Sequence, residues 1–101
     1  MKYFIDTHDR TKNSWPKKDV SEAEFLEIYA AFGKAVEQQG GHDLGVHVNV
    51  EKGRAFCFTY GRDEDAIRRA HEQMNFPYDS ITEVRQVTGV DLRPEPACAK
   101  K

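Results

Sequence analysis

The chain has 101 residues, enough for one domain with a modest hydrophobic core. Its 15 Lys and Arg residues nearly balance 17 Asp and Glu residues, and the net charge of -2 does not favour nucleic acid or an anionic membrane as a partner. The sequence contains no apolar run of about 18 residues, and its N-terminus becomes acidic before a signal-peptide core could form. We expect a soluble cytoplasmic protein with a single domain over residues 1–92 and a flexible tail over residues 93–101.

The first two predicted elements are a strand and a capped helix. Residues 2–8, KYFIDTH, are apolar and β-prone at their start, which predicts a strand. A helix should begin after Ser21, because Ser21 and Glu24 have the spacing of a capping box, and it should end at residues 40–41, which are both glycine. Within it, apolar side chains recur at helical spacing and predict one face that covers a sheet: Phe25, Ile28, Tyr29, Phe32 and Val36.

Residues 44–50 and 54–60 predict a β-hairpin with a three-residue loop, Glu51 to Gly53. A loop of this length that ends in glycine is typical of a type I turn with a bulge, and this choice fixes the register. In that register His47 lies opposite Cys57, with about 5 Å between their Cβ atoms. One face of the hairpin then carries an apolar set: Val46, Val48, Val50, Phe56, Phe58 and Tyr60.

Residues 63–74 predict a second helix, with acidic residues at its start and His71 on its inner face. Residues 80–87, SITEVRQV, predict a last strand. The order strand, helix, strand, strand, helix, strand is that of the split βαβ or ferredoxin-like unit, an α+β fold with a four-stranded antiparallel sheet. The helices should cover one sheet face, and we expect the other face to meet a second copy in a homodimeric α+β barrel.

A metal site is the chemistry that these residues indicate. Asp6 and His8 form a D-x-H pair whose side chains leave the same sheet face, and the first strand of such a sheet pairs with the strand that carries Cys57. Nitrogen, sulfur and oxygen donors together suit a divalent transition metal such as nickel, zinc or copper, although Asp6 could instead orient a ligating histidine. The predicted metal-site residues are Asp6, His8, His47, Cys57 and His71.

The place of His71 in this site is open. If the valine and phenylalanine face of the hairpin lies under the helices, His47 and Cys57 face the other way, and an inward-pointing His71 cannot join them. Either the register is reversed relative to the helices, or His71 belongs to a different site.

Other interpretations of the same residues also stay open. Cys57 could be a packed thiol, since free cysteine is among the most buried residue types, and His71 could be a structural histidine. A covalent role for Cys57 is a weaker hypothesis, because it lies within a strand rather than at a loop or helix start. Two rival functions are an α+β-barrel enzyme that binds a small molecule between sheet and helices, and an interaction module whose histidines are structural.

Several motifs resemble those of a family of small bacterial proteins catalogued as a domain of unknown function, which includes an actinobacterial nickel-binding member. The resemblance covers residues 2–88 and rests on YFIDTH, RAFCF, DAIRRAHEQMNFP and ITEV. The family motifs match Asp6, His8, His47, Phe56, Cys57, His71, Glu83 and Val84. The resemblance implies a ferredoxin-like fold, a homodimer and nickel as the metal, but no established reaction. The loop over residues 10–18, which carries Trp15, is longer than the family's usual connection.

Overall fold

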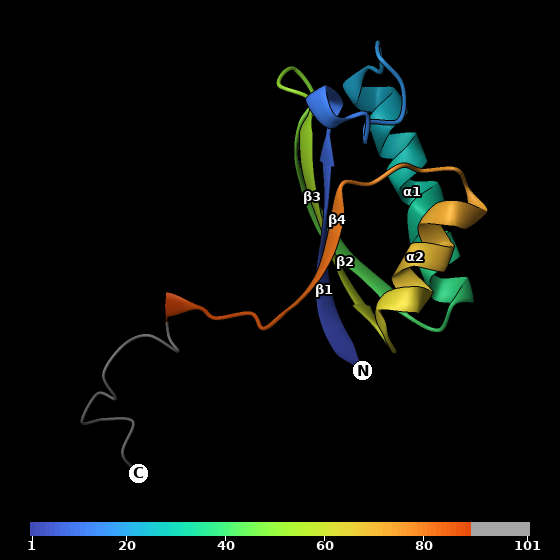
Figure 1. Cartoon of the computed structure of the whole chain (residues 1–101), viewed down its shortest axis with the longest axis vertical. Helices are drawn as coiled ribbons and strands as arrows, with labels where there is room; N and C mark the ends of the chain where they lie inside the picture. The colour runs from blue at the N-terminus through green and yellow to red at the C-terminus, as the bar shows by residue number, and fades with distance from the viewer. Residues whose placement is uncertain (90–101) are drawn as a thin grey trace.

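The computed structural model describes residues 1–89 of the chain, and the predicted boundary between domain and tail at residue 92 lies outside them. The elements follow one another as β1 (Lys2–Asp9), the 3-10 helix η1 (Arg10–Lys12), α1 (Glu22–Gln38), β2 (His42–Asn49), β3 (Arg54–Gly61), α2 (Glu64–Gln73) and β4 (Ser80–Val84). The strands form one antiparallel sheet in the order β2-β3-β1-β4. Both helices lie on one face of this sheet (Figure 1), which confirms the predicted ferredoxin-like α+β fold.

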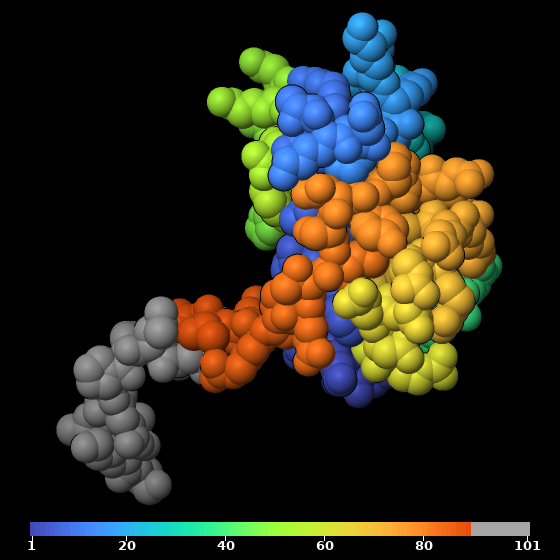
Figure 2. Space-filling model, viewed as in Figure 1, coloured from blue at the N-terminus to red at the C-terminus, as the bar shows by residue number. Residues whose placement is uncertain are grey.

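After β4 the chain leaves the body of the domain, as the space-filling view shows (Figure 2). Residues 85–89 are exposed there. Within residues 1–89, neither helix has the length and apolar character that a membrane crossing requires.

Helix α1 begins as its sequence predicts. The Ser21 hydroxyl accepts from the Glu24 backbone N–H at 3.1 Å, and the Glu24 carboxylate accepts from the Ser21 backbone N–H at 3.1 Å. This reciprocal pair satisfies two N–H groups that a helix start otherwise leaves free. The helix then buries Phe25, Phe32 and Val36 against the sheet, and the indole of Trp15 stacks on Phe25 at 5.1 Å.

The hairpin between β2 and β3 has a four-residue loop, so the predicted register is wrong by one residue. Its last pair is Asn49 with Arg54, and Val50 therefore belongs to the loop. The Gly53 N–H donates to the Val50 carbonyl at 3.1 Å, and Gly53 takes a left-handed φ of 66° that favours glycine.

This register separates the predicted pair of site residues. Val46 lies opposite Cys57, whereas His47 lies opposite Phe56. Because successive side chains of a strand point to opposite faces, Cys57 faces the helices and His47 faces away from them. The predicted apolar face is likewise divided. The three valines pack against the core, and the aromatic residues of β3 lie on the opposite side.

The sheet face that the helices leave uncovered is rich in aromatic side chains, and we call it the open face. Tyr3 stacks on Phe58 at 5.5 Å, and the Arg54 guanidinium lies 5.2 Å from the centre of the Phe56 ring. Tyr3 is 40% exposed and Phe56 is 37% exposed. Large exposed rings of this kind are typical of a face that binds a partner. The homodimer stays a prediction, and the open face is where we expect its interface.

Candidate metal centre

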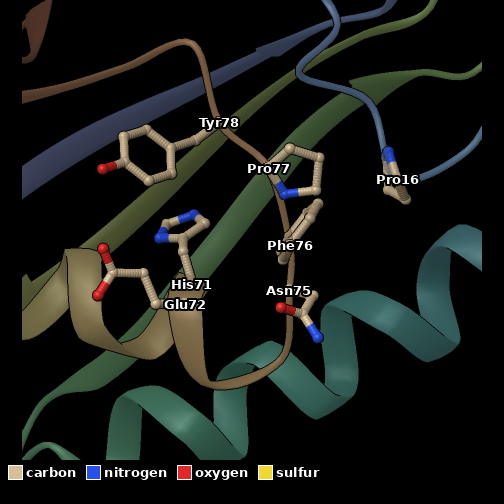
Figure 3. A pocket seen from close by; sticks show the side chains of 7 residues that line it. All are labelled: Pro16, His71, Glu72, Asn75, Phe76, Pro77 and Tyr78. Carbon is tan, nitrogen blue, oxygen red and sulfur yellow. The ribbon is translucent and has the colours of Figure 1, made fainter.

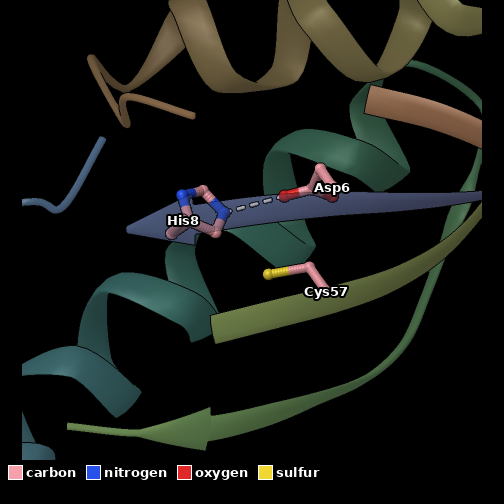
Figure 4. A group of neighbouring side chains, drawn as sticks. All are labelled: Asp6, His8 and Cys57. Atoms are coloured by element: carbon pink, nitrogen blue, oxygen red, sulfur yellow. Dashed lines mark hydrogen bonds and ion pairs between the residues drawn. The ribbon is translucent and has the colours of Figure 1, made fainter. Parts of the chain in front are cut away.

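Asp6, His8 and Cys57 come together beneath the helices. Asp6 and His8 both point to the helix side of β1, and Asp6 pairs directly with Cys57 of β3. All three side chains are fully buried. Each offers one ligand atom within 4.8 Å of the others, and Figure 4 shows the imidazole, carboxylate and thiol above the same part of the sheet.

His71 reaches the same cluster from α2. Its Nε2 lies 2.9 Å from Oδ2 of Asp6, and Nε2 of His8 lies 2.8 Å from the same oxygen. The open question about His71 is thereby answered, because it lies on the face that carries Cys57. His47 is the predicted site residue that the structure leaves out, since it is exposed on the open face.

Both imidazoles are held by their other ring nitrogen. Nδ1 of His8 lies 2.6 Å from the Pro77 carbonyl oxygen and 3.2 Å from that of Ser14, and Nδ1 of His71 lies 2.8 Å from the Ile67 carbonyl oxygen. A carbonyl oxygen only accepts hydrogen bonds, so each Nδ1 carries a proton. The Nε2 atoms therefore face inward, in the arrangement that ligating histidines usually have.

Proton counting shows what this arrangement favours. Two nitrogen lone pairs and a carboxylate oxygen repel one another, so the two Nε2 contacts with Asp6 need two protons and leave a net positive charge among buried groups. A divalent cation removes this problem, because one carboxylate and one thiolate balance its charge while both imidazoles stay neutral. Oδ1 of Asp6, buried without a hydrogen-bond partner, provides a further donor atom. The residues present thus fit a divalent metal.

The electrostatics of the cluster agree with this assignment. Burial alone raises the pKa of the Asp6 carboxyl, but the hydrogen bonds with His71 and His8 outweigh burial and lower this pKa below its usual value. Burial, together with the negative charge of Asp6, raises the pKa of the Cys57 thiol. Without a metal, Asp6 is therefore a carboxylate and Cys57 a thiol, and a bound cation would favour the thiolate.

Sequence reasoning missed the segment that orders this site, residues 75–79, which we call the strap. The Phe76 ring stacks on His8 at 4.3 Å, the Pro77 carbonyl accepts from His8, and the Tyr78 ring lies 4.8 Å from His71. The end of the predicted helix at residue 74 is the available signal, since it shows that the chain turns back here. It does not reveal which backbone carbonyl would meet a histidine.

A surface hollow of about 500 Å³ lies beside the strap and reaches His71 (Figure 3). Its rim includes the carboxylate of Glu72 and the ring of Tyr78. His71 itself is only 1% exposed. The hollow therefore approaches the cluster around Asp6 without opening it to solvent.

Comparisons with known proteins agree with the fold. Residues 4–84 match the model of the family described as nickel responsive protein SCO4226-like. The crystal structure of SCO4226 from Streptomyces coelicolor A3(2) is similar, with a TM-score of 0.70 and 19% sequence identity over 85% of this chain and 99% of that chain. At this identity the likeness shows the fold alone. No curated protein matches the chain.

Proposed function

Because the chain belongs to the SCO4226-like family of nickel-responsive proteins, we propose that it binds a divalent transition metal, with nickel as the metal, through Asp6, His8, Cys57 and His71. The observation that carries this proposal is the convergence of two imidazole Nε2 atoms on Oδ2 of Asp6, at 2.8 and 2.9 Å. The Cys57 thiol lies beside them on the paired strand.

The donor set supports a transition metal rather than calcium or magnesium. Imidazole suits nickel, zinc and copper, and a thiolate is a soft ligand that magnesium and calcium do not select. Affinity for such donors generally increases towards copper, so the site by itself does not exclude zinc or copper. The description of the family favours nickel.

Each residue has a distinct task in this proposal. Asp6 and Cys57 supply the negative charge that balances the cation. His8 and His71 supply neutral nitrogen ligands, and the carbonyls of Pro77, Ser14 and Ile67 keep their rings in position. The metal would act as a Lewis acid or as a structural link between β1, β3 and α2.

A metal must displace part of the protein to reach this site, because all four side chains are buried. The geometry supports the hollow beside the strap as the route by which a metal enters the site. The Glu72 carboxylate at its rim attracts a cation, and the Tyr78 ring lines the hollow 4.8 Å from the His71 ring.

Isothermal titration of the full chain with nickel, zinc and copper tests the proposal. We expect one saturable site per chain, lost in the Asp6→Asn variant and kept in the His47→Ala variant. Absence of saturable binding at micromolar concentrations of all three metals would contradict it.

The alternative of an α+β-barrel enzyme receives less support from the geometry. Between sheet and helices the described side chains form a packed core that includes Phe25, Phe32, Val36 and Phe76. A small substrate needs a cavity where this core lies.

A further inference from the structure

The long loop after β1 borders a second cavity, separate from the metal centre. This cavity of about 430 Å³ is lined by Arg10, Asn13, Trp15, Lys17 and Lys18. The lining contains three cationic side chains, and no acidic side chain is among these five residues. A concave surface of one charge sign favours a ligand of the opposite sign.

Arg10 is held in a fixed position by the hairpin loop between β2 and β3. Its guanidinium donates to the carbonyls of Glu51 at 2.7 Å and Val50 at 3.4 Å, and its backbone N–H donates to the Gly53 carbonyl at 2.9 Å. Glycine is needed at position 53, because an added Cβ would lie 2.6 Å from Cβ of Arg10. These acceptors are neutral, so the guanidinium keeps its full charge and further N–H groups.

Trp15 contributes an aromatic wall to the cavity. The residue is only 6% exposed, and its ring lies against Phe25 on one side and lines the cavity. The indole Nε1–H is buried and has no hydrogen-bond partner within residues 1–89. Buried donors of this kind are uncommon in folded proteins. This one is covered by protein atoms, so a ligand in the cavity meets the face of the indole ring rather than its N–H.

The two lysines differ in how much of their charge is free. Lys17 forms an ion pair with Glu24 at 2.6 Å, so its charge is shared. Lys18 is exposed, and the described part of the chain offers it no hydrogen bond or ion pair. Arg10 and Lys18 are therefore the cations available to a ligand.

We propose that this cavity binds the phosphate-type oxyanion of a small molecule. Two available cations complement a dianion, and a guanidinium matches the oxygen geometry of phosphate. The volume lies within the range of small-molecule sites and exceeds what one phosphate group fills. The site does not depend on the proposed metal centre, because it shares none of the four metal ligands.

Trp15 is the single tryptophan of the chain, so its fluorescence reports on the cavity. We expect inorganic phosphate and glycerol phosphate to change the fluorescence of the full chain in a saturable way, at an ionic strength held constant with sodium chloride. Lys18→Gln should raise the apparent Kd about three- to tenfold, because it removes one charge-assisted contact. Lys34→Gln, which removes an exposed lysine of α1, should leave the Kd unchanged.

The two probes separate the sources of the oxyanion. Tighter binding of glycerol phosphate supports a phosphorylated small molecule, whereas a site that takes only inorganic phosphate overturns that part of the proposal. An equal response to acetate would overturn the assignment to phosphate. A response that chloride reproduces, or a Kd that Lys18→Gln does not change, would overturn the site itself.

Discussion

Cys57 and His47 belong to neighbouring strands, yet their side chains point to opposite faces of the sheet. Cys57 is fully buried and lies opposite Asp6 of β1, whereas His47 lies on the open face opposite Phe56. The backbone of the sheet separates them. A single metal ion cannot contact both groups without rebuilding the hairpin.

Nickel affinity should therefore respond differently to these two residues. We expect Cys57→Ala to weaken nickel binding at least tenfold, because it removes a thiolate ligand. His47→Ala should leave the Kd within about twofold. Calorimetry of both variants in a Cys98→Ala background, which removes the chain's second cysteine, provides the measurement. Equal losses of affinity in the two variants would contradict the placement of the metal site on the sheet face that the helices cover.

The one-residue error in the hairpin explains why sequence reasoning misplaced His47. A three-residue and a four-residue loop can both end at Gly53. The alternation of residues 44–50 with 54–60 favours the three-residue loop, because only that register puts the valines and the aromatic residues on one face. The hydrogen bond from Gly53 to Val50 decides between them, and it is a property of the folded loop. Side chains alternate between the two faces of a strand, so a register shift of one residue moves every side chain of the strand to the opposite face relative to its partner strand.

Other features were predictable because their signals are local. The capping box of α1 needs only Ser21 and Glu24, and the side chains of Asp6 and His8 share a face whenever residues 2–8 form a strand. The contact between His71 and Asp6 joins residues 65 positions apart, so it depends on how α2 packs over β1. The sequence indicated His71 and Asp6 as candidate site residues, but it did not determine whether they contact each other.

Nickel should stabilise the folded chain if the four buried groups are its ligands. Binding only to the native state contributes about 2.7 kcal/mol when free nickel is at 100 times its Kd. For a domain of this size, that corresponds to an increase in Tm of roughly 10–20 °C. Calorimetric melting with and without nickel measures the shift, and a chelator should reverse it.

Asp6→Asn is the matched variant for this melting experiment. It keeps the size of the side chain but removes the charge that balances the cation, so nickel should no longer raise its Tm. The Asp43→Asn variant, which changes a carboxylate bonded to Tyr29 instead, should retain the shift. A nickel-dependent increase in Tm that Asp6→Asn leaves intact would argue against the proposed ligand set.

The strap should limit how fast nickel enters and leaves. We expect Tyr78→Ala to increase both the association and the dissociation rates severalfold, because it removes the ring that lies 4.8 Å from His71 at the edge of the hollow. The Kd should change little, since Tyr78 is not a proposed ligand. Stopped-flow mixing with nickel, followed by chelator challenge, measures both rates. Tyr60→Ala, on the open face, is the control, and unchanged rates in Tyr78→Ala would exclude this route.

The open face should mediate self-association. We expect Phe56→Glu to convert a dimer to a monomer, because it places a charge among the exposed aromatic side chains of this face. Leu26→Glu changes a residue of α1 that is 47% exposed and should leave the dimer intact. Sedimentation velocity distinguishes the two variants. A wild-type chain that sediments as a monomer at high concentration would contradict the expected homodimer.

Glu24 should make the stability of α1 sensitive to acid. Hydrogen bonds from Lys17 and then from Ser21 lower the pKa of the Glu24 carboxyl from 4.5 to about 2 in the folded state. The unfolded chain therefore takes up this proton more readily. The contribution of Glu24 to the free energy of unfolding is present above about pH 4.5 and is lost as the pH falls through about 2.

Glu24→Gln should be less stable than wild type at pH 7, and the difference in the free energy of unfolding should shrink steadily between pH 4.5 and 2. Urea unfolding across this pH range measures the difference, with Glu22→Gln as a control that leaves the capping box intact. A difference that stays constant down to pH 2 would show that the charge of Glu24 does not stabilise the helix start.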